Sequence, residues 1–70
     1  MTVIHHTESI DILLRMRDVC QQTGLSKASV YRHIESGSFP RATQIVGVSR
    51  WSQKEVQQWI SAQLARRVSA

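Results

Sequence analysis

Apolar and polar positions repeat along the first half of the chain at a spacing that predicts two short helices. Either Val19 and Cys20 or Val19 and Thr23 mark the inward side of residues 16–23. Val30 and Ile34, four positions apart, mark the apolar side of residues 27–35. Side chains three or four positions apart share one face of a helix, so these residues can pack inward together. The other positions of the second helix are mostly polar and include basic side chains. We expect this helix to present a polar, cationic side outward.

A tight corner is predicted between the two helices. Gly24 stands where the first helix needs a left-handed residue to stop, Leu25 can fill the corner, and Ser26 is a favourable N-cap for the next helix. Gly37 ends the second helix, and Pro40 enforces an extended exit. A helix, a tight corner and a second helix form the arrangement of a helix-turn-helix that reads DNA.

The second half of the chain predicts a hairpin followed by one more helix. Residues 42–51 carry β-branched side chains on both sides of Gly47, which indicates a two-stranded wing. Ser52 followed by Glu55 is typical of a capping box at the start of a helix. An apolar stripe consists of Val56, Trp59, Ile60 and Leu64. This stripe predicts a helix that ends near residues 66–67.

The predicted elements give one domain that is mainly α with a small β-hairpin, a winged helix-turn-helix of three helices plus a wing. Residues 1–11 are polar and lack a period, so we expect a flexible N-terminal arm. The domain then covers residues 12–66, and residues 67–70 form a C-terminal tail. The apolar run over residues 12–16 is compatible with either an extended edge segment or the entry to the first helix.

Length and charge narrow the class of partner. A chain of 70 residues buries only about 60% of its unfolded surface, so we do not expect a deep catalytic cleft. Nine Lys and Arg against five Asp and Glu give a net charge of +4, and most of the basic residues follow Ser26. A basic half favours a polyanionic partner, either nucleic acid or an anionic membrane surface. The membrane alternative is weak, because no apolar run approaches the roughly 18 residues needed to span a bilayer.

Candidate chemistry outside nucleic-acid binding is sparse. The start of the chain has neither a basic leader nor a long apolar stretch, and the single Cys20 excludes an internal disulfide, so we expect a cytoplasmic protein. His5, His6, Cys20 and His33 offer metal-ligating atoms without the spacing of a metal site. There is no glycine-rich phosphate loop and no ordered set of Ser, His and Asp. We expect no metal, no cofactor and no enzymatic activity.

Three segments in this order resemble a known family. They are the corner with the second helix (Thr23–Arg32), its exit (Gly37–Pro40), and the end of the hairpin with the start of the last helix (Arg50–Ile60). From about Leu14 to Leu64 the chain resembles the small AlpA-type phage and prophage regulators, which belong with excisionases and MerR-like winged helix-turn-helix proteins. The resemblance implies a DNA-binding protein whose second helix enters the major groove. It also implies that the hairpin touches the neighbouring minor groove or backbone.

The resemblance also implies which residues contact DNA and which hold the fold. The groove-facing positions of the family fall on Lys27, Ser29, Tyr31 and Arg32. Its cap and core positions fall on Leu25, Val30, Trp51 and Trp59. Family members often carry a basic residue just after the hairpin glycine, where this chain has Val48. The wing contact would then rest on Thr43, Ser49 or Arg50.

The side chains of the second helix fit these roles and also admit plainer ones. The arginine fork of Arg32 suits a guanine edge, and Lys27 suits a phosphate as a point charge. Both could instead be solvated helix charges. Tyr31 can donate its hydroxyl to a phosphate, or it can be a half-buried packing residue.

We therefore expect a sequence-specific, double-stranded DNA-binding protein of phage or prophage type. It would act as a transcriptional regulator, as a recombination directionality factor (excisionase), or as both, and would associate cooperatively with further copies on DNA. The alternative is a protein-interaction module of the same fold that binds and modulates an integrase or a response regulator. Val46 and Val48 favour this alternative, because they place apolar side chains at the wing tip.

Overall fold

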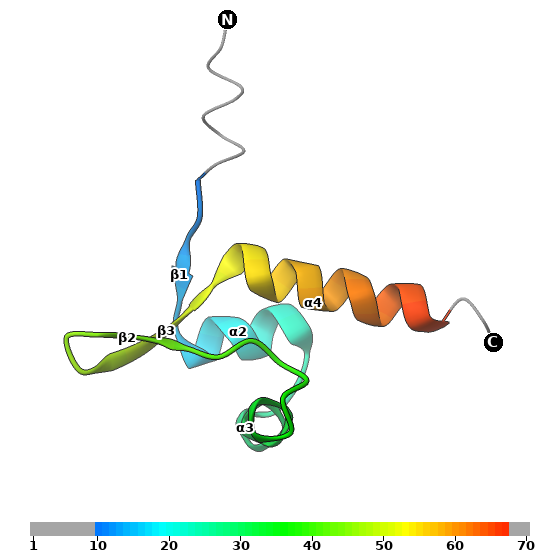
Figure 1. Cartoon of the computed structure of the whole chain (residues 1–70), viewed down its shortest axis with the longest axis horizontal. Coiled ribbons are helices and arrows are strands. Elements are labelled where there is room, and N and C mark those ends of the chain that lie inside the picture. Colours follow the sequence, from blue (N-terminus) through cyan, green and yellow to red (C-terminus); the bar gives the residue numbers. More distant parts are fainter. Residues whose placement is uncertain (1–9, 68–70) are drawn as a thin grey trace, which may run out of the picture.

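The computed structural model of the chain describes residues 10–67 (Figure 1). The expectations for residues 1–9, with His5 and His6, and for residues 68–70 lie outside the described residues. In chain order, the elements are β1 (Leu13–Leu14), α2 (Met16–Thr23), α3 (Lys27–Glu35), β2 (Thr43–Ile45), β3 (Val48–Ser52) and α4 (Gln53–Arg66).

The three helices and the small sheet form a winged helix-turn-helix, as the sequence predicts. The helices α2 and α3 are joined by the short corner at Gly24, and α4 lies across α2 on the side away from α3 (Figure 1). The hairpin of β2 and β3 extends sideways from this helical body, while the C-terminal half of α4 extends in the opposite direction (Figure 1). The wing and the end of α4 therefore lie at opposite ends of the molecule.

The sheet has three strands, one more than the predicted hairpin. All pairs are antiparallel and the order is β1-β3-β2, with Leu14 opposite Trp51 and Thr43 opposite Arg50. Within β1, Leu13 is exposed and Leu14 is buried, which is the alternation of a strand with one face on the core. The first part of the apolar run at residues 12–16 is thus an extended edge segment, β1, and its last residue, Met16, begins α2.

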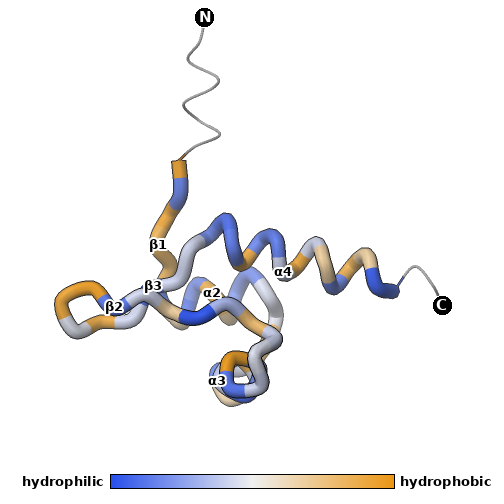
Figure 2. The backbone as a smooth tube through the Cα atoms, viewed as in Figure 1, coloured by the Kyte–Doolittle hydropathy of each residue, from blue (hydrophilic) through white to orange (hydrophobic). Residues whose placement is uncertain are grey.

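A compact core joins every layer of the fold. Six side chains are almost completely buried and contact one another: Leu14, Val19, Val30, Phe39, Trp51 and Val56. Burying a side chain of this size stabilises a protein by roughly 1.5–3 kcal/mol. Trp59 and Ile60 are partly buried and cover the edge of this cluster. Figure 2 shows that apolar positions also occur away from the core, at the wing tip and along the segment that leads into β1.

The helix boundaries have local causes. Gly24 adopts φ +75° after α2, and its amide donates to the carbonyl oxygen of Cys20. The Ser26 hydroxyl oxygen accepts from the amide of Ser29 at 3.2 Å, so Ser26 is the N-cap of α3, as predicted. Gly37, at φ +82°, follows the last turn of α3. These stop and start signals explain why both helices have the predicted bounds.

The start of α4 is fastened by a residue from the predicted N-terminal arm. Ser52 caps the helix as expected by accepting from the amide of Glu55 at 3.2 Å. The carboxylate of Asp11 accepts from the Ser52 hydroxyl and from the amide of Lys54. These hydrogen bonds lower the pKa of Asp11, and the bond from Ser52 has the largest effect. The chain just before β1 is thus tied to the helix that follows β3.

Candidate nucleic-acid interface

Helix α3 presents one face to the core and a polar face to solvent. Val30 is 0% exposed and Ile34 packs against the core, so this side points inward. A helix turns about 100° per residue, which places Ala28 and Arg32 on the opposite side. Both are exposed, and Tyr31 beside them is 46% exposed. The cationic side of α3 is therefore presented outward.

Arg32 is held by the hydroxyl group of Ser29, which lies in the first turn of α3. Its Nη2 donates to the Oγ of Ser29 at 3.1 Å, and the Ser26 hydroxyl donates to the same Ser29 oxygen at 3.2 Å. Ser29 is half-buried, whereas Arg32 is exposed. The guanidinium is thus anchored at one nitrogen and keeps further N–H groups for a ligand.

The four predicted groove residues do not share one environment. Lys27, Tyr31 and Arg32 are exposed, and Ser29 is the half-buried one. Ala28 was not predicted as a site residue, although it lies in the centre of the outward face. The spacing of four between Ala28 and Arg32 was a usable signal, because it places the two residues on one face.

The three predicted wing residues lie on two faces of the hairpin. Thr43 and Arg50 are cross-strand partners and share one face. Ser49 pairs with Gln44 and lies on the other face, the same face as the buried Trp51. The Gln44 amide donates to the Ser49 hydroxyl at 2.8 Å, and the Arg50 guanidinium donates to the Ser49 carbonyl oxygen at 2.8 Å. Only Thr43 and Arg50 can therefore contact the same ligand surface.

The wing ends in a two-residue turn with an unusual backbone. Val46 and Gly47 have φ of +48° and +82°, the left-handed pair that a tight turn between antiparallel strands requires. Glycine adopts this region freely, but a β-branched residue such as valine does so only with strain. Val46 is also 97% exposed, and Val48 next to the turn is 45% exposed. The tip is therefore apolar, strained and open to solvent.

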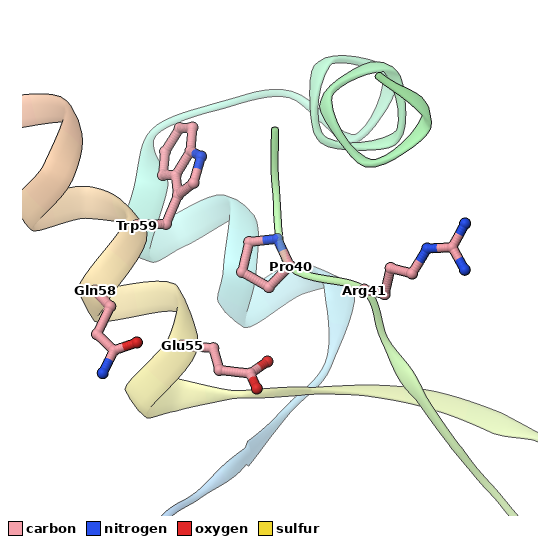
Figure 3. A pocket seen from close by; sticks show the side chains of 5 residues that line it. All are labelled: Pro40, Arg41, Glu55, Gln58 and Trp59. Carbon is pink, nitrogen blue, oxygen red and sulfur yellow. The ribbon is translucent and has the colours of Figure 1, made fainter. Parts of the chain in front are cut away.

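Two depressions flank α4. The larger, of about 510 Å³, lies between α4 and the segment that leaves α3, and it is lined by Pro40, Arg41, Glu55, Gln58 and Trp59 (Figure 3). Trp59 forms its wall and is held in place by an edge contact with Phe39, with ring centroids 4.9 Å apart. Figure 3 shows the Arg41 side chain pointing away from Gln58 and Glu55. Arg41 thus lines the depression with its guanidinium turned away from the Glu55 carboxylate.

The smaller depression is more apolar and lies between the corner after α2 and the second half of α4. Its volume is about 390 Å³, and its lining residues are Gln22, Thr23, Leu25, His33, Trp59, Ile60, Gln63 and Leu64. Over residues 10–67, no three metal-ligating side chains gather in one place. Within that same part of the chain, the helices are too short or too polar to cross a bilayer.

A comparison with protein-family models identifies the family of the chain. The family model described as Prophage CP4-57 regulatory protein (AlpA) matches residues 12–64, which span every strand and nearly all of α4. The comparisons with curated proteins and with solved structures gave no match. The matched segment contains the corner, helix α3 and the wing, and it covers well over half of the chain. The chain therefore belongs to the AlpA family of prophage regulatory proteins.

Proposed function

We propose that this protein is a phage- or prophage-type regulator that binds double-stranded DNA with sequence specificity. The observation that carries the proposal is the exposed guanidinium of Arg32, which lies on the outward face of α3 and is anchored by Ser29. An outward, cationic helix behind a capped corner fits the major groove. Membership in a family of prophage regulators supports this function.

The exposed residues divide into two roles. Arg32 reads a base edge through two parallel hydrogen bonds, for which guanine is the preferred partner of arginine. Lys27 and Tyr31, exposed beside it, bind phosphates and fix the register. Thr43 and Arg50 share one face of the wing and contact the backbone of the neighbouring groove. No cofactor takes part in this binding.

One such domain covers few base pairs, so several copies bind adjacent sites cooperatively. The protein acts in the cytoplasm on a promoter, on an attachment site, or on both. In the first case it regulates transcription, and in the second it directs excision together with an integrase or another recombinase.

The decisive experiment compares Arg32→Ala with the wild type on its own promoter or attachment region by fluorescence titration. We expect a loss of about 1–3 kcal/mol on the specific site and a smaller loss on unrelated DNA. Arg67→Ala is the matched control, because it removes an equal charge at the far end of α4. This control should leave the sequence preference unchanged. Equal affinity and equal discrimination for the wild type and Arg32→Ala would remove α3 as the reading helix.

A second candidate function is protein binding through the wing. It is favoured by the apolar tip, where Val46 is 97% exposed and Val48 is 45% exposed. The partner would be an integrase or a response regulator, whose activity the wing would modulate. The salt dependence of binding separates the two functions, because phosphate neutralisation weakens steeply with added salt. Binding to an isolated protein partner that is nearly insensitive to salt would favour the second function.

A further inference from the structure

The first turn of α3 contains a series of hydrogen bonds that connects Ser26, Ser29 and Arg32. The Ser29 amide donates to the Ser26 hydroxyl oxygen, and the Ser26 hydroxyl donates in turn to the Ser29 hydroxyl oxygen, both at 3.2 Å. The same Ser29 oxygen accepts from Nη2 of Arg32 at 3.1 Å. The Ser29 oxygen therefore accepts two hydrogen bonds, one from the helix cap and one from the guanidinium.

We propose that Ser29 is a positioning residue for Arg32 and does not read a base itself. The proposal rests on the DNA-binding function stated above. It assigns to Ser29 a role different from that of the exposed residues around it, because both acceptor lone pairs of its hydroxyl oxygen are already used within the protein and only its O–H donor is left. Its consequence for recognition is that the guanidinium meets the duplex with fewer orientations available to it.

Arginine benefits from such support because its side chain is long and loses rotamer freedom on binding. A hydrogen bond to Ser29 removes part of this freedom before DNA arrives. The guanidinium carries five N–H donors, so one bond to Ser29 leaves enough donors for a two-pronged contact with guanine. Ala28, the outward neighbour one turn earlier, has no polar atom in its side chain that could draw the guanidinium away from Ser29.

The position of Ser29 on the helix agrees with this role. Ser29 lies about 100° around the helix from the inward Val30, whereas Arg32 lies near the opposite side. Ser29 is accordingly half-buried on the flank of α3, and Arg32 is exposed. A hydroxyl on the flank can reach the guanidinium, as the 3.1 Å distance shows, without occupying the face that would enter the groove.

The test is a double-mutant cycle on a site chosen by the wild-type protein from a pool of random duplexes. Affinities for that duplex, and for duplexes with each guanine replaced in turn, are measured for the wild type, Ser29→Ala, Arg32→Ala and the double variant. Immobilising one side chain is worth a factor of about three to ten, so Ser29→Ala should lose that much affinity on the selected duplex. It should also lose preference at the same guanine that Arg32→Ala ceases to distinguish. In the Arg32→Ala background, Ser29→Ala should cost nothing further.

Two matched variants separate the hydroxyl from the shape of the side chain. Ser29→Thr keeps the hydroxyl and should retain the guanine preference, while Ser29→Val has the shape of threonine without the hydroxyl and should lose it. Ser61→Ala removes an exposed serine hydroxyl from α4 and should change nothing. Circular dichroism melts of each variant report folding. If Ser29→Ala does not fold, the comparison of threonine with valine decides the question.

Each other outcome overturns the inference in a recognisable way. A loss from Ser29→Ala that is equally large with and without Arg32 would mean that Ser29 contacts DNA on its own. Unchanged affinity and preference in Ser29→Ala would mean that the hydroxyl does not position Arg32. If the wild type selects no sequence at all, the proposed function itself fails, and the positioning role fails with it.

Discussion

The strained turn at the wing tip predicts that one surface substitution stabilises the protein. Val46 has φ +48° and is 97% exposed. Its backbone conformation is therefore unfavourable, and its side chain makes no buried contacts that would compensate. Asparagine tolerates the left-handed region, and Asn followed by Gly is the preferred pair in such a turn. Gly47 already occupies the second position. Replacing Val46 with asparagine should therefore relieve the strain.

The magnitude follows from the cost of left-handed backbone. The left-handed region destabilises a residue other than glycine by roughly 1–2 kcal/mol, and this cost is smaller for asparagine. Almost no packing is lost, because Val46 is 97% exposed. We expect Val46→Asn to raise the free energy of unfolding by about 1 kcal/mol. For a domain of 60–100 residues, this corresponds to a rise of roughly 4–8 °C in Tm.

Thermal and urea unfolding, followed by circular dichroism, measure this change. Val48→Asn is the matched control, because it makes the same chemical change in a strand residue with an ordinary backbone. The control should lose stability, since asparagine is a poor strand former. A Tm for Val46→Asn that is unchanged or lower than that of the wild type would refute the strain argument. If stability rises while binding to DNA or to a partner falls, Val46 is retained for contact rather than for folding.

Two further predictions concern the core and the helix start. Trp51→Ala should lower the free energy of unfolding by about 3–5 kcal/mol, which leaves little of the roughly 3.5–10 kcal/mol available to a domain of this size. Trp51→Phe should lower the free energy of unfolding by less than its lost volume suggests, because the buried Nε1 of Trp51 has no hydrogen-bond partner. Urea unfolding measures both changes. The lowered pKa of Asp11 means that its carboxylate stabilises the fold above about pH 4, and that this stabilisation disappears as pH falls through the folded pKa. Asp11→Asn should therefore lower Tm at pH 7, and the gap to the wild type should narrow toward pH 2; a gap that is constant with pH would contradict the assigned charge.

The helices were predictable because their signals are local. Gly24, Ser26 and Gly37 act on backbone within a few positions, so the sequence places the bounds of α2 and α3 correctly. The hairpin was predictable in outline from its β-branched residues, although Val46 preceding Gly47 is a poor turn sequence. The burial of Trp51 also agrees with its assignment to the core.

The remaining features depend on contacts between distant residues. The pairing of Leu14 with Trp51 decides between strand and helix at the start of the domain, and periodicity cannot reveal such a partner. Asp11 reaches Ser52 across 41 positions, so no local pattern indicates this bond. The arrangement at Ser29 depends on side-chain rotamers in the folded helix. For the same reason, residue type alone did not separate Ser29 from its exposed neighbours.

Strand β3 divides its hydrogen bonds between two partners along its length. Val48, Ser49 and Arg50 pair with β2, whereas Trp51 and Ser52 pair with β1. None of the six core side chains belongs to the part shared with β2. Bending or fraying the hairpin therefore uncovers almost no apolar interior and costs only a few exposed hydrogen bonds. The hairpin can therefore change its angle to the helices and adapt to the surface of a ligand, while the core around Trp51 stays intact.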